Sequence, residues 1–359
     1  MNSLLQLKAL GQRIWLDNLS RTLLSEGGLK QLAEDDGVAG VTSNPSIFFK
    51  AISDSPYYRE EAAVLRRDAA LTPEQRYERL AIADIQAACD LLRPLFDQTR
   101  GEDGYVSLEV SPALAHDAPG TIAAARRLRT AVSRDNLLIK VPATPAGVAA
   151  IETLIGEGCS INVTLMFSLM HVRDVACAYI RGLEKWTAGG GEARRVKSVA
   201  SLFLSRVDTL VDKRLEALGG EALMLRGKTG VALARLAYQE YKTIFKGAQF
   251  APLAARGARP QFMLWASTGT KNPAYSDVLY VESLIGPETI NTLPDATLAA
   301  FRDHGRASAT LESEIEAARQ QFAALARLGI DMDGVGEELQ VEGVKLFSDS
   351  FEQLLKLMA

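Results

Sequence analysis

The chain alternates between short, almost wholly apolar runs and longer stretches in which apolar residues recur every three or four positions. Eight short runs predict β-strands, and helix-like stretches separate nearly all of them. This alternation is typical of βα units joined by right-handed crossovers into a parallel sheet. Eight units within 359 residues favour a closed (β/α)8 TIM barrel with additional helices over an open sheet. The predicted strands are Ile14–Asp17, Gly37–Thr42, Val106–Val110, Leu137–Val141, Ser160–Leu165, Lys197–Leu202, Phe262–Ala266 and Val278–Val281.

The connection after the fourth strand has the clearest helix signals. Thr144 is a good N-cap residue, and Pro145 suits the first helical position. Ile151 and Ile155 lie four residues apart, which places both on one face of a helix. Gly156 then ends the predicted helix shortly before the fifth strand.

Two connections are too long for a single helix. Residues 45–104 and 206–260 each contain more than one helical pattern, so we expect helical insertions there rather than second domains. The end of the chain, about 307–358, predicts two or three helices on the outside of the barrel. We therefore interpret residues 1–359 as a single (β/α)8 domain.

Composition narrows the class of protein. The chain is 47% hydrophobic and 23% charged, as expected for a globular protein, and its net charge is −4. No basic stripe suggests nucleic acid or a membrane surface as a partner. The three cysteines follow no metal-binding spacing, and the first residues do not resemble a secretory leader. We therefore expect a cytoplasmic protein.

Lys140 is the most informative residue. It lies in the apolar run Leu137–Val141, where a lysine needs either a charged partner or a compensating change in proton affinity. An ordinary lysine has a pKa of about 10.4, and a nucleophilic one must be brought to roughly 7–8. Apolar neighbours favour the neutral amine, which attacks carbonyl groups. The alternative is that Lys140 has only a structural role, as the partner of Glu109 in an ion pair.

Polar residues end most of the other predicted strands. In a (β/α)8 barrel the carboxyl ends of the strands build the active site, so these side chains are expected to meet around Lys140. Each has a simpler explanation when taken alone: Asp17 as an N-cap, Asn44 before Pro45 as a turn residue. Together they indicate a site. The polar strand-end residues are Asp17, Thr42, Asn44, Glu109, Asn162, Thr164, Ser201, Arg206 and Ser267.

These residues lie in segments that resemble the transaldolases, which are Schiff-base aldolases of the pentose phosphate pathway. The similar segments are GVTSNPSIF at 40–48, SLEVSP at 107–112, LLIKVPATPAG at 137–147, GCSINVTLMFS at 158–168, SLFLSRVD at 201–208 and WASTGTKNP at 265–273. They are spread along most of the predicted barrel, and their spaced combination is far more specific than any single segment.

The resemblance implies a role for each strand-end residue. Lys140 matches the Schiff-base lysine, Glu109 the acid–base glutamate that works through a water, and Asp17 the aspartate that takes the hydroxyl proton beside the breaking bond. One position departs from the family: Gly269 stands where many members have an arginine, and we expect Lys271 to replace its charge. The implied substrate-binding residues are Thr42, Asn44, Asn162, Thr164, Ser201, Arg206, Ser267 and Lys271.

The resemblance also implies the reaction and its partners. A three-carbon dihydroxyacetone unit would pass from a ketose phosphate (sedoheptulose 7-phosphate or fructose 6-phosphate) to an aldose phosphate (glyceraldehyde 3-phosphate or erythrose 4-phosphate). No metal and no cofactor is expected, nor a nucleic acid or membrane partner; the protein is expected as a monomer or homodimer. Because an adjacent carboxylate favours the ammonium form of a lysine, we expect a water between Glu109 and Lys140.

Three alternatives stay open. A plain Schiff-base aldolase would release free dihydroxyacetone, although Asp17 and Glu109 resemble the transaldolase pair rather than the tyrosine-based acid of fructose-6-phosphate aldolases. A sugar-phosphate-binding barrel without catalysis would keep Arg206, Ser267 and Lys271 but would not need Lys140. A metal-dependent aldolase is disfavoured by the lack of ligand clusters.

Overall fold

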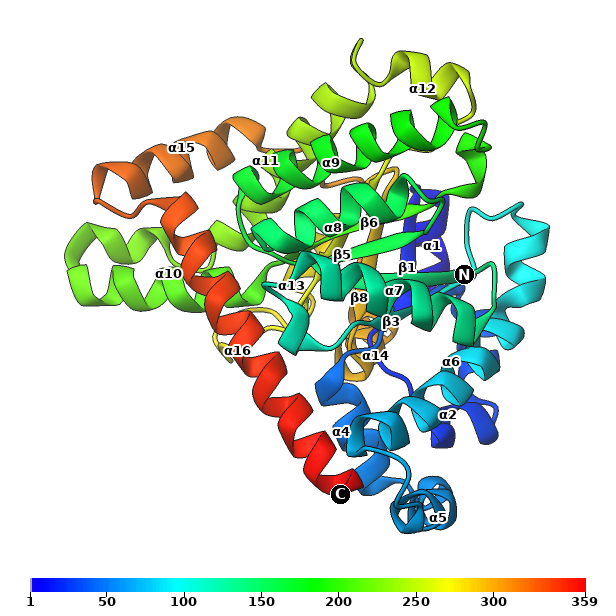
Figure 1. The fold of residues 1–359 in the computed structure, drawn as a ribbon. Coiled ribbons are helices and arrows are strands. Elements are labelled where there is room, and N and C mark those ends of the chain that lie inside the picture. Colours follow the sequence, from blue (N-terminus) through cyan, green and yellow to red (C-terminus); the bar gives the residue numbers. More distant parts are fainter. Residues whose placement is uncertain (1) are drawn as a thin grey trace.

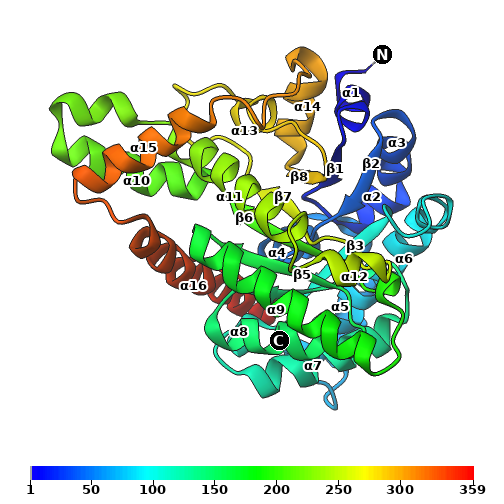
Figure 2. The same ribbon diagram turned by 90° about the horizontal axis from the view of Figure 1, so that it is seen from above.

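A computed structural model describes residues 2–359 and shows a closed barrel of eight parallel strands, surrounded by helices (Figures 1 and 2). The strands follow one another around the barrel in chain order, so each pairs with its sequence neighbour and β8 closes onto β1. The predicted (β/α)8 fold is confirmed. The strands are β1 (Gln12–Leu16), β2 (Val38–Val41), β3 (Tyr105–Glu109), β4 (Leu137–Pro142), β5 (Ile161–Met166), β6 (Ser198–Phe203), β7 (Phe262–Ala266) and β8 (Thr289–Leu293).

Seven predicted strands overlap the observed ones, and the eighth was wrong. The run Val278–Val281 contributes to a short helix, α13 (Leu279–Glu282), and the true β8 begins further along the chain, at Thr289. A four-residue apolar run fits a buried helix as well as a strand. Tyr280 and Val281 are indeed buried, but against the outside of the barrel rather than within its wall.

Helices fill the connections between strands. The helix after β4 has the predicted start, because the Thr144 hydroxyl accepts a hydrogen bond from Gly147 N–H at 3.0 Å and Pro145 follows. The α-helices are α1 (Ser3–Ala9), α2 (Arg21–Ser25), α3 (Gly28–Asp35), α4 (Pro45–Asp54), α5 (Arg59–Arg67), α6 (Pro73–Gln98), α7 (Ala118–Val132), α8 (Pro145–Ile155), α9 (Leu169–Ala188), α10 (Ser205–Leu218), α11 (Thr229–Phe245), α12 (Ala251–Ala255), α13, α14 (Asp295–His304), α15 (Ile315–Arg327) and α16 (Met332–Met358). Short 3₁₀ helices are η1 (Pro56–Tyr58), η2 (Pro112–Leu114), η3 (Ala193–Arg195) and η4 (Gly220–Leu225).

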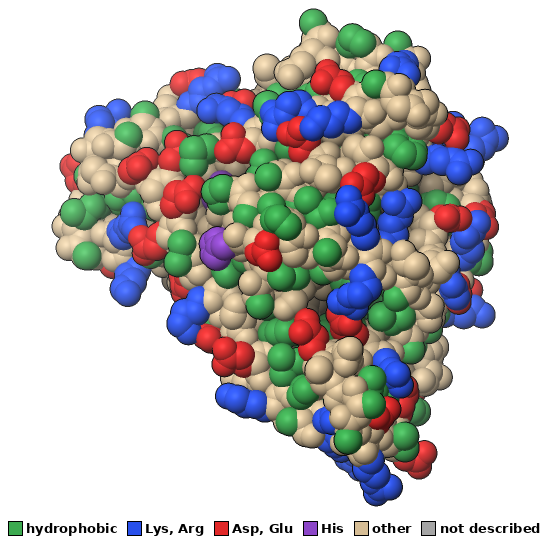
Figure 3. All heavy atoms as spheres, in the orientation of Figure 1, with side chains coloured by type: hydrophobic (Ala, Val, Ile, Leu, Met, Phe, Trp, Pro, Cys, Tyr) green, Lys and Arg blue, Asp and Glu red, His purple; other side chains and the backbone are tan. Residues whose placement is uncertain are grey.

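Both long connections consist of helices. Residues 45–104 form α4, η1, α5 and α6, and residues 206–260 form most of α10 with η4, α11 and α12. In both views α10 and α15 lie together at one edge of the molecule (Figures 1 and 2). On the face drawn in Figure 3, acidic and basic side chains are interspersed, in keeping with the small net charge.

The last helix contacts more of the barrel than the sequence indicated. Helix α16, drawn in red, runs across the molecule instead of packing only on the outer layer (Figure 1). Its Gln340 side chain donates a hydrogen bond to Leu165 O at the end of β5, and its Ser350 hydroxyl accepts one from Ser46 on α4. The C-terminal helix therefore reaches the carboxyl end of the barrel.

The strand register aligns the polar side chains. Glu109 on β3 pairs with Lys140 on β4, and Lys140 pairs with Asn162 on β5. Residues that pair in adjacent parallel strands point to the same face of the sheet. The three side chains therefore form one layer of the barrel at its carboxyl end. A shift in the β5–β6 register and the left-handed backbone of Leu165 (φ 57°) mark a bulge just beyond this layer.

Candidate active site

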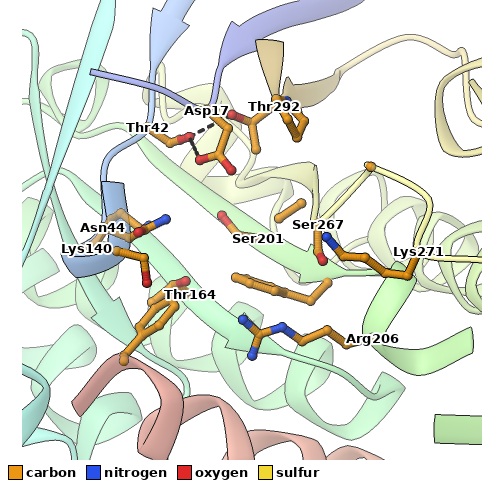
Figure 4. Close-up of a pocket in the computed structure, with 16 residues that line it drawn as sticks. Asp17, Thr42, Asn44, Lys140, Thr164, Ser201, Arg206, Ser267, Lys271 and Thr292 are labelled. Atoms are coloured by element: carbon orange, nitrogen blue, oxygen red, sulfur yellow. Dashed lines mark hydrogen bonds between the residues drawn. The ribbon is translucent and has the colours of Figure 1, made fainter. Parts of the chain in front are cut away.

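A cavity of about 210 Å³ opens at the carboxyl end of the barrel (Figure 4). Its position fits the rule that (β/α)8 barrels build their sites from the ends of the strands and the loops that follow. Figure 4 shows Asp17, Thr42 and Thr292 on one side of it, and Arg206, Ser267 and Lys271 on another. The lining residues are Asp17, Thr42, Asn44, Ser46, Lys140, Thr164, Ser201, Phe203, Arg206, Ala266, Ser267, Gly269, Lys271, Thr292, Pro294 and Phe347.

Lys140 is buried in this cavity, with only 4% of its surface exposed. Its Nζ donates a hydrogen bond to Ser43 O at 2.9 Å and lies 3.4 Å from Glu109 Oε2. This direct ion pair contradicts the expectation of a bridging water, because no water fits between atoms that close. Burial raises the pKa of Glu109, and the Lys140 ammonium opposes that rise. Glu109 therefore holds a proton more readily than an exposed glutamate.

Asp17 ends β1 and belongs to a second polar cluster. The Thr42 hydroxyl donates a hydrogen bond to Asp17 Oδ1 at 2.7 Å and lies 2.7 Å from the Thr292 hydroxyl. Burial raises the pKa of Asp17, while the hydrogen bond from Thr42 and the charge of Lys140 oppose the rise. A carboxylate with a raised pKa is a better proton acceptor than an exposed one. Asp17 is thus suited to act as a general base.

A chain of hydrogen bonds orients the Ser201 side chain at the wall of the cavity. Ser201 donates to Asn162 Oδ1 at 2.7 Å, and Asn162 Nδ2 donates to Ser107 Oγ at 3.0 Å. Ser201 lines the cavity, whereas Asn162 does not. Thr164, which also lines the cavity, has a buried hydroxyl without a hydrogen-bond partner within residues 2–359. That hydroxyl is available to a bound water or a sugar hydroxyl.

The other end of the cavity is basic. Arg206, in the first turn of α10, has a buried Nη1 that bonds no group within the described chain. Burial lowers the pKa of the guanidinium, and Glu342 partly offsets this effect. A buried, unpaired guanidinium is costly, and a phosphate is its natural bidentate partner.

Ser267 and Lys271 lie near Arg206. Ser267 has a left-handed backbone (φ 53°), a costly conformation for serine that is typical of functional sites, and its hydroxyl lies 2.8 Å from that of Ser205. Gly269 lines the cavity without contributing a charge. Figure 4 shows the exposed Lys271 side chain extended toward Ser267. These three polar side chains therefore lie together, on the side of the cavity away from Asp17 (Figure 4).

Comparison with known proteins is consistent with this arrangement. Residues 14–358 match the family described as Transaldolase/Fructose-6-phosphate aldolase. The chain belongs to this family. It is 57% identical over 356 residues to a transaldolase of Thiobacillus denitrificans, with 99% of both chains covered. It is 50% identical over 355 residues to a transaldolase of Neisseria gonorrhoeae, again with 99% of both chains covered. It is 44% identical to "Transaldolase 2" of a Nostoc species, covering 99% of this chain and 96% of that one.

Nine of the eleven residues that we predicted for the site line the cavity at the carboxyl end of the barrel. The other two, Glu109 and Asn162, do not line it but contact the lining residues Lys140 and Ser201. Asn44 lines the cavity, and instead of a simple turn it forms the N-cap of α4, where its Oδ1 accepts a hydrogen bond from Ile47 N–H at 3.0 Å.

Sequence reasoning missed several lining residues. Thr292 escaped notice because β8 was misplaced, and Phe347 because α16 was expected on the outside. Phe203 and Phe347 both lie beside Arg206, with ring centroids 5.6 Å and 6.0 Å from its Cζ. Two aromatic rings flanking a guanidinium exclude water from it, which strengthens its attraction for an anion.

The remaining motifs do not converge on the cavity. His171 is buried, and its Nδ1 accepts from Phe167 N–H at 3.1 Å, which is a structural role; His304 is exposed among aspartates. All three cysteines are unpaired. Within residues 2–359, no group of three or more His, Cys, Asp and Glu side chains has an arrangement that holds a metal ion. Nor does any helix in that range have the length and apolar character needed to cross a bilayer.

Proposed function

We propose that this protein is a transaldolase that moves a dihydroxyacetone unit from a ketose phosphate to an aldose phosphate through a Schiff base on Lys140. The observation that carries the proposal is the buried Lys140 amine, with Glu109 on one side, Asp17 across the cavity and an unpaired Arg206 at the far end. A nucleophile, two carboxyl groups and an anion site are the parts that this reaction requires.

The first half of the cycle forms the Schiff base. Lys140 must lose a proton before it can attack, and Glu109, at 3.4 Å with a raised pKa, is placed to take it. The neutral amine bonds to C2 of the ketose, and the carbonyl oxygen becomes a hydroxyl. Glu109 then returns a proton to that hydroxyl, which leaves as water and produces an iminium. Thr164, with its unpartnered hydroxyl, is suited to hold the departing water.

The second half cleaves and rebuilds a carbon–carbon bond. Asp17 removes the C4 hydroxyl proton, the C3–C4 bond breaks, and its electron pair moves into the iminium to leave an enamine on Lys140. The aldose phosphate departs with the new carbonyl at its former C4. A second aldose phosphate enters, the enamine carbon attacks its carbonyl, and Asp17 returns the proton. Hydrolysis of the new iminium releases the product.

The shape of the cavity supports phosphorylated substrates. Asp17 and Lys140 lie toward one side, and Arg206, Ser267 and Lys271 toward another (Figure 4). A phosphate held by these three groups would fix the sugar chain so that the reacting carbons lie between Lys140 and Asp17. We propose sedoheptulose 7-phosphate and fructose 6-phosphate as donors, and glyceraldehyde 3-phosphate and erythrose 4-phosphate as acceptors.

We further propose that the protein acts in the cytoplasm, in the non-oxidative pentose phosphate pathway, as a monomer or homodimer and as one (β/α)8 domain. The odd number and wide spacing of its three cysteines support a reducing compartment. Two of them, Cys89 and Cys159, are buried in the core.

Borohydride trapping tests the Schiff base. Incubation with fructose 6-phosphate and borohydride should add one reduced three- or six-carbon adduct, which peptide mapping should place on Lys140. The Lys140→Met variant, which keeps the length of the side chain, should stay folded and trap nothing. An adduct that persists in this variant, or one that maps to a different lysine, would refute the assignment.

A product assay separates transfer from simple aldol cleavage. With fructose 6-phosphate and erythrose 4-phosphate present, sedoheptulose 7-phosphate should accumulate and free dihydroxyacetone should stay a minor product. Rapid release of dihydroxyacetone that does not depend on erythrose 4-phosphate would identify an aldolase instead. Full activity in the presence of EDTA is expected from a mechanism in which the iminium is the electron sink.

A further inference from the structure

A second and larger cavity, of about 560 Å³, lies at the opposite end of the barrel. It is bounded by Tyr105 at the start of β3, Leu137 at the start of β4 and Cys159 just before β5. The amino ends of barrel strands normally serve stability rather than binding. The volume is nevertheless within the range of small-molecule sites, and it exceeds that of the Lys140 cavity.

The acidic side chains of this cavity are already neutralised. Asp97 lies 2.8 Å from Arg93 Nε, and Asp135 lies 3.4 Å from Nη1 of the same arginine. Glu192 pairs with Arg195 at 2.7 Å. These are the three carboxylates that line the cavity.

Three of its arginines are not neutralised. Arg100, Arg129 and Arg194 line the cavity, and none has a carboxylate within 4 Å in the chain from residue 2 to 359. They come from three separate segments: the turn after α6, helix α7 and helix η3. Arg129 Nη1 donates a hydrogen bond only to a backbone oxygen, Glu157 O, at 3.4 Å. Three guanidinium groups without a carboxylate partner around one hollow, in a protein of net charge −4, favour a polyanionic ligand.

The walls of the cavity are aromatic and apolar. Trp186 is half-buried, and its Nε1 donates to Glu192 O at 3.0 Å. Its ring packs against Gly158, where an added Cβ would approach it to 2.7 Å, so the ring is held in place. Phe96 packs edge-on against Tyr105 with centroids 5.4 Å apart. A fixed indole beside an apolar floor favours a flat ring in the ligand.

We propose that this cavity binds a small molecule that joins a flat aromatic ring to two or more phosphate groups, the chemistry of a nucleoside di- or triphosphate. The phosphates contact Arg100, Arg129 and Arg194, and the ring lies against Trp186. The cavity is separate from the sugar-phosphate site: Ile139 lines it, while the next residue, Lys140, points to the other face of β4.

Tryptophan fluorescence tests the proposal without a new label. Trp15 and Trp265 are fully buried, so Trp186 is the partly exposed indole that responds to a ligand. ATP, added without a metal ion, should change the emission saturably with a Kd tighter than about 1 mM. Tripolyphosphate should displace ATP, but when it is added alone it should leave the tryptophan emission unchanged. Adenosine should bind far more weakly than ATP.

Matched variants assign the site. Arg129→Ala and Arg194→Ala should each weaken ATP binding by about tenfold, as expected for loss of one charged hydrogen bond. Arg126→Ala is the control on the same helix, because Arg126 pairs with Glu157 and does not line the cavity. Arg206→Ala should leave the fluorescence response intact, which separates this site from phosphate binding near Lys140. Circular dichroism checks that each variant is folded.

Three outcomes would overturn the whole proposal, and a fourth would overturn its aromatic part. The first is the lack of any saturable change with ATP, confirmed by calorimetry. The second is an equal loss of affinity in Arg126→Ala, which would indicate general attraction to a basic surface. The third is loss of the response in Arg206→Ala, which would place the anion in the sugar-phosphate cavity. If tripolyphosphate binds as tightly as ATP, the ring contact with Trp186 is refuted.

Discussion

Replacing Arg206 by alanine is the sharpest test of the anion-binding end of the Lys140 cavity. Its Nη1 is buried and has no hydrogen-bond partner within residues 2–359, and the Phe203 and Phe347 rings both lie beside the guanidinium. A phosphate bound there would form charge-assisted hydrogen bonds in a site largely screened from water. Each such bond contributes about 1.5–3 kcal/mol, and a bidentate contact rather more than one of them.

From these values, Arg206→Ala should remove about 2–4 kcal/mol of transition-state stabilisation for fructose 6-phosphate, which lowers kcat/KM roughly 30- to 1,000-fold. The loss should be far smaller for unphosphorylated fructose, because that substrate has no group to contact the arginine. Arg206→Lys should recover part of the activity, since an ammonium keeps the charge but not the two-pronged geometry. Steady-state kinetics with both sugars measures the difference directly.

The control is Arg214→Ala, on the same helix as Arg206. Arg214 pairs with Glu338 at the surface, does not line the cavity, and should change kcat/KM little for either sugar. Thermal unfolding of both variants checks that the Phe203 and Phe347 rings still pack. The reasoning is refuted if Arg206→Ala costs the same factor with fructose as with fructose 6-phosphate.

Three further changes test the fold around the site. Gly40→Ala should destabilise the barrel by about 1–3 kcal/mol in urea unfolding, because the new Cβ would lie 2.6 Å from the Trp15 ring; unchanged stability would contradict this packing. Burial raises the pKa of Asp208 to about 6 despite the hydrogen bond from Tyr280, so its contribution to stability is present below about pH 4 and lost as the pH rises through 6. Relative to wild type, Asp208→Asn should therefore gain about 2.4 kcal/mol of unfolding free energy between about pH 4 and pH 7, and a pH-independent difference would count against it. Phe347→Leu should raise KM for phosphorylated donors about fivefold, because the ring no longer contacts the Arg206 guanidinium. As a check, KM for unphosphorylated fructose should be the same in the variant and the wild type.

Long apolar runs made most of the barrel predictable. Seven strands were placed within one or two residues because each is flanked by residues that end strands or begin helices. β8 lacks that signal, since polar Thr289, Asn291 and Thr292 interrupt its five residues. All three are buried; Thr289 accepts a hydrogen bond from Gln12, and Asn291 donates one to Tyr280 O. Polar side chains buried inside a barrel are indistinguishable from loop residues when only the sequence is known.

The contact between Lys140 and Glu109 shows which information the strand pattern lacks. The sequence singled out both residues and predicted an attraction between them, but the expected distance between them was wrong. That separation depends on register: Glu109 pairs directly with Lys140 across β3 and β4, so both side chains enter the same layer of the barrel. A shift of one residue would have turned one of them to the opposite face. Predicted strand ends uncertain by one residue do not fix this register, so a direct ion pair and a water-bridged pair were equally compatible with the sequence.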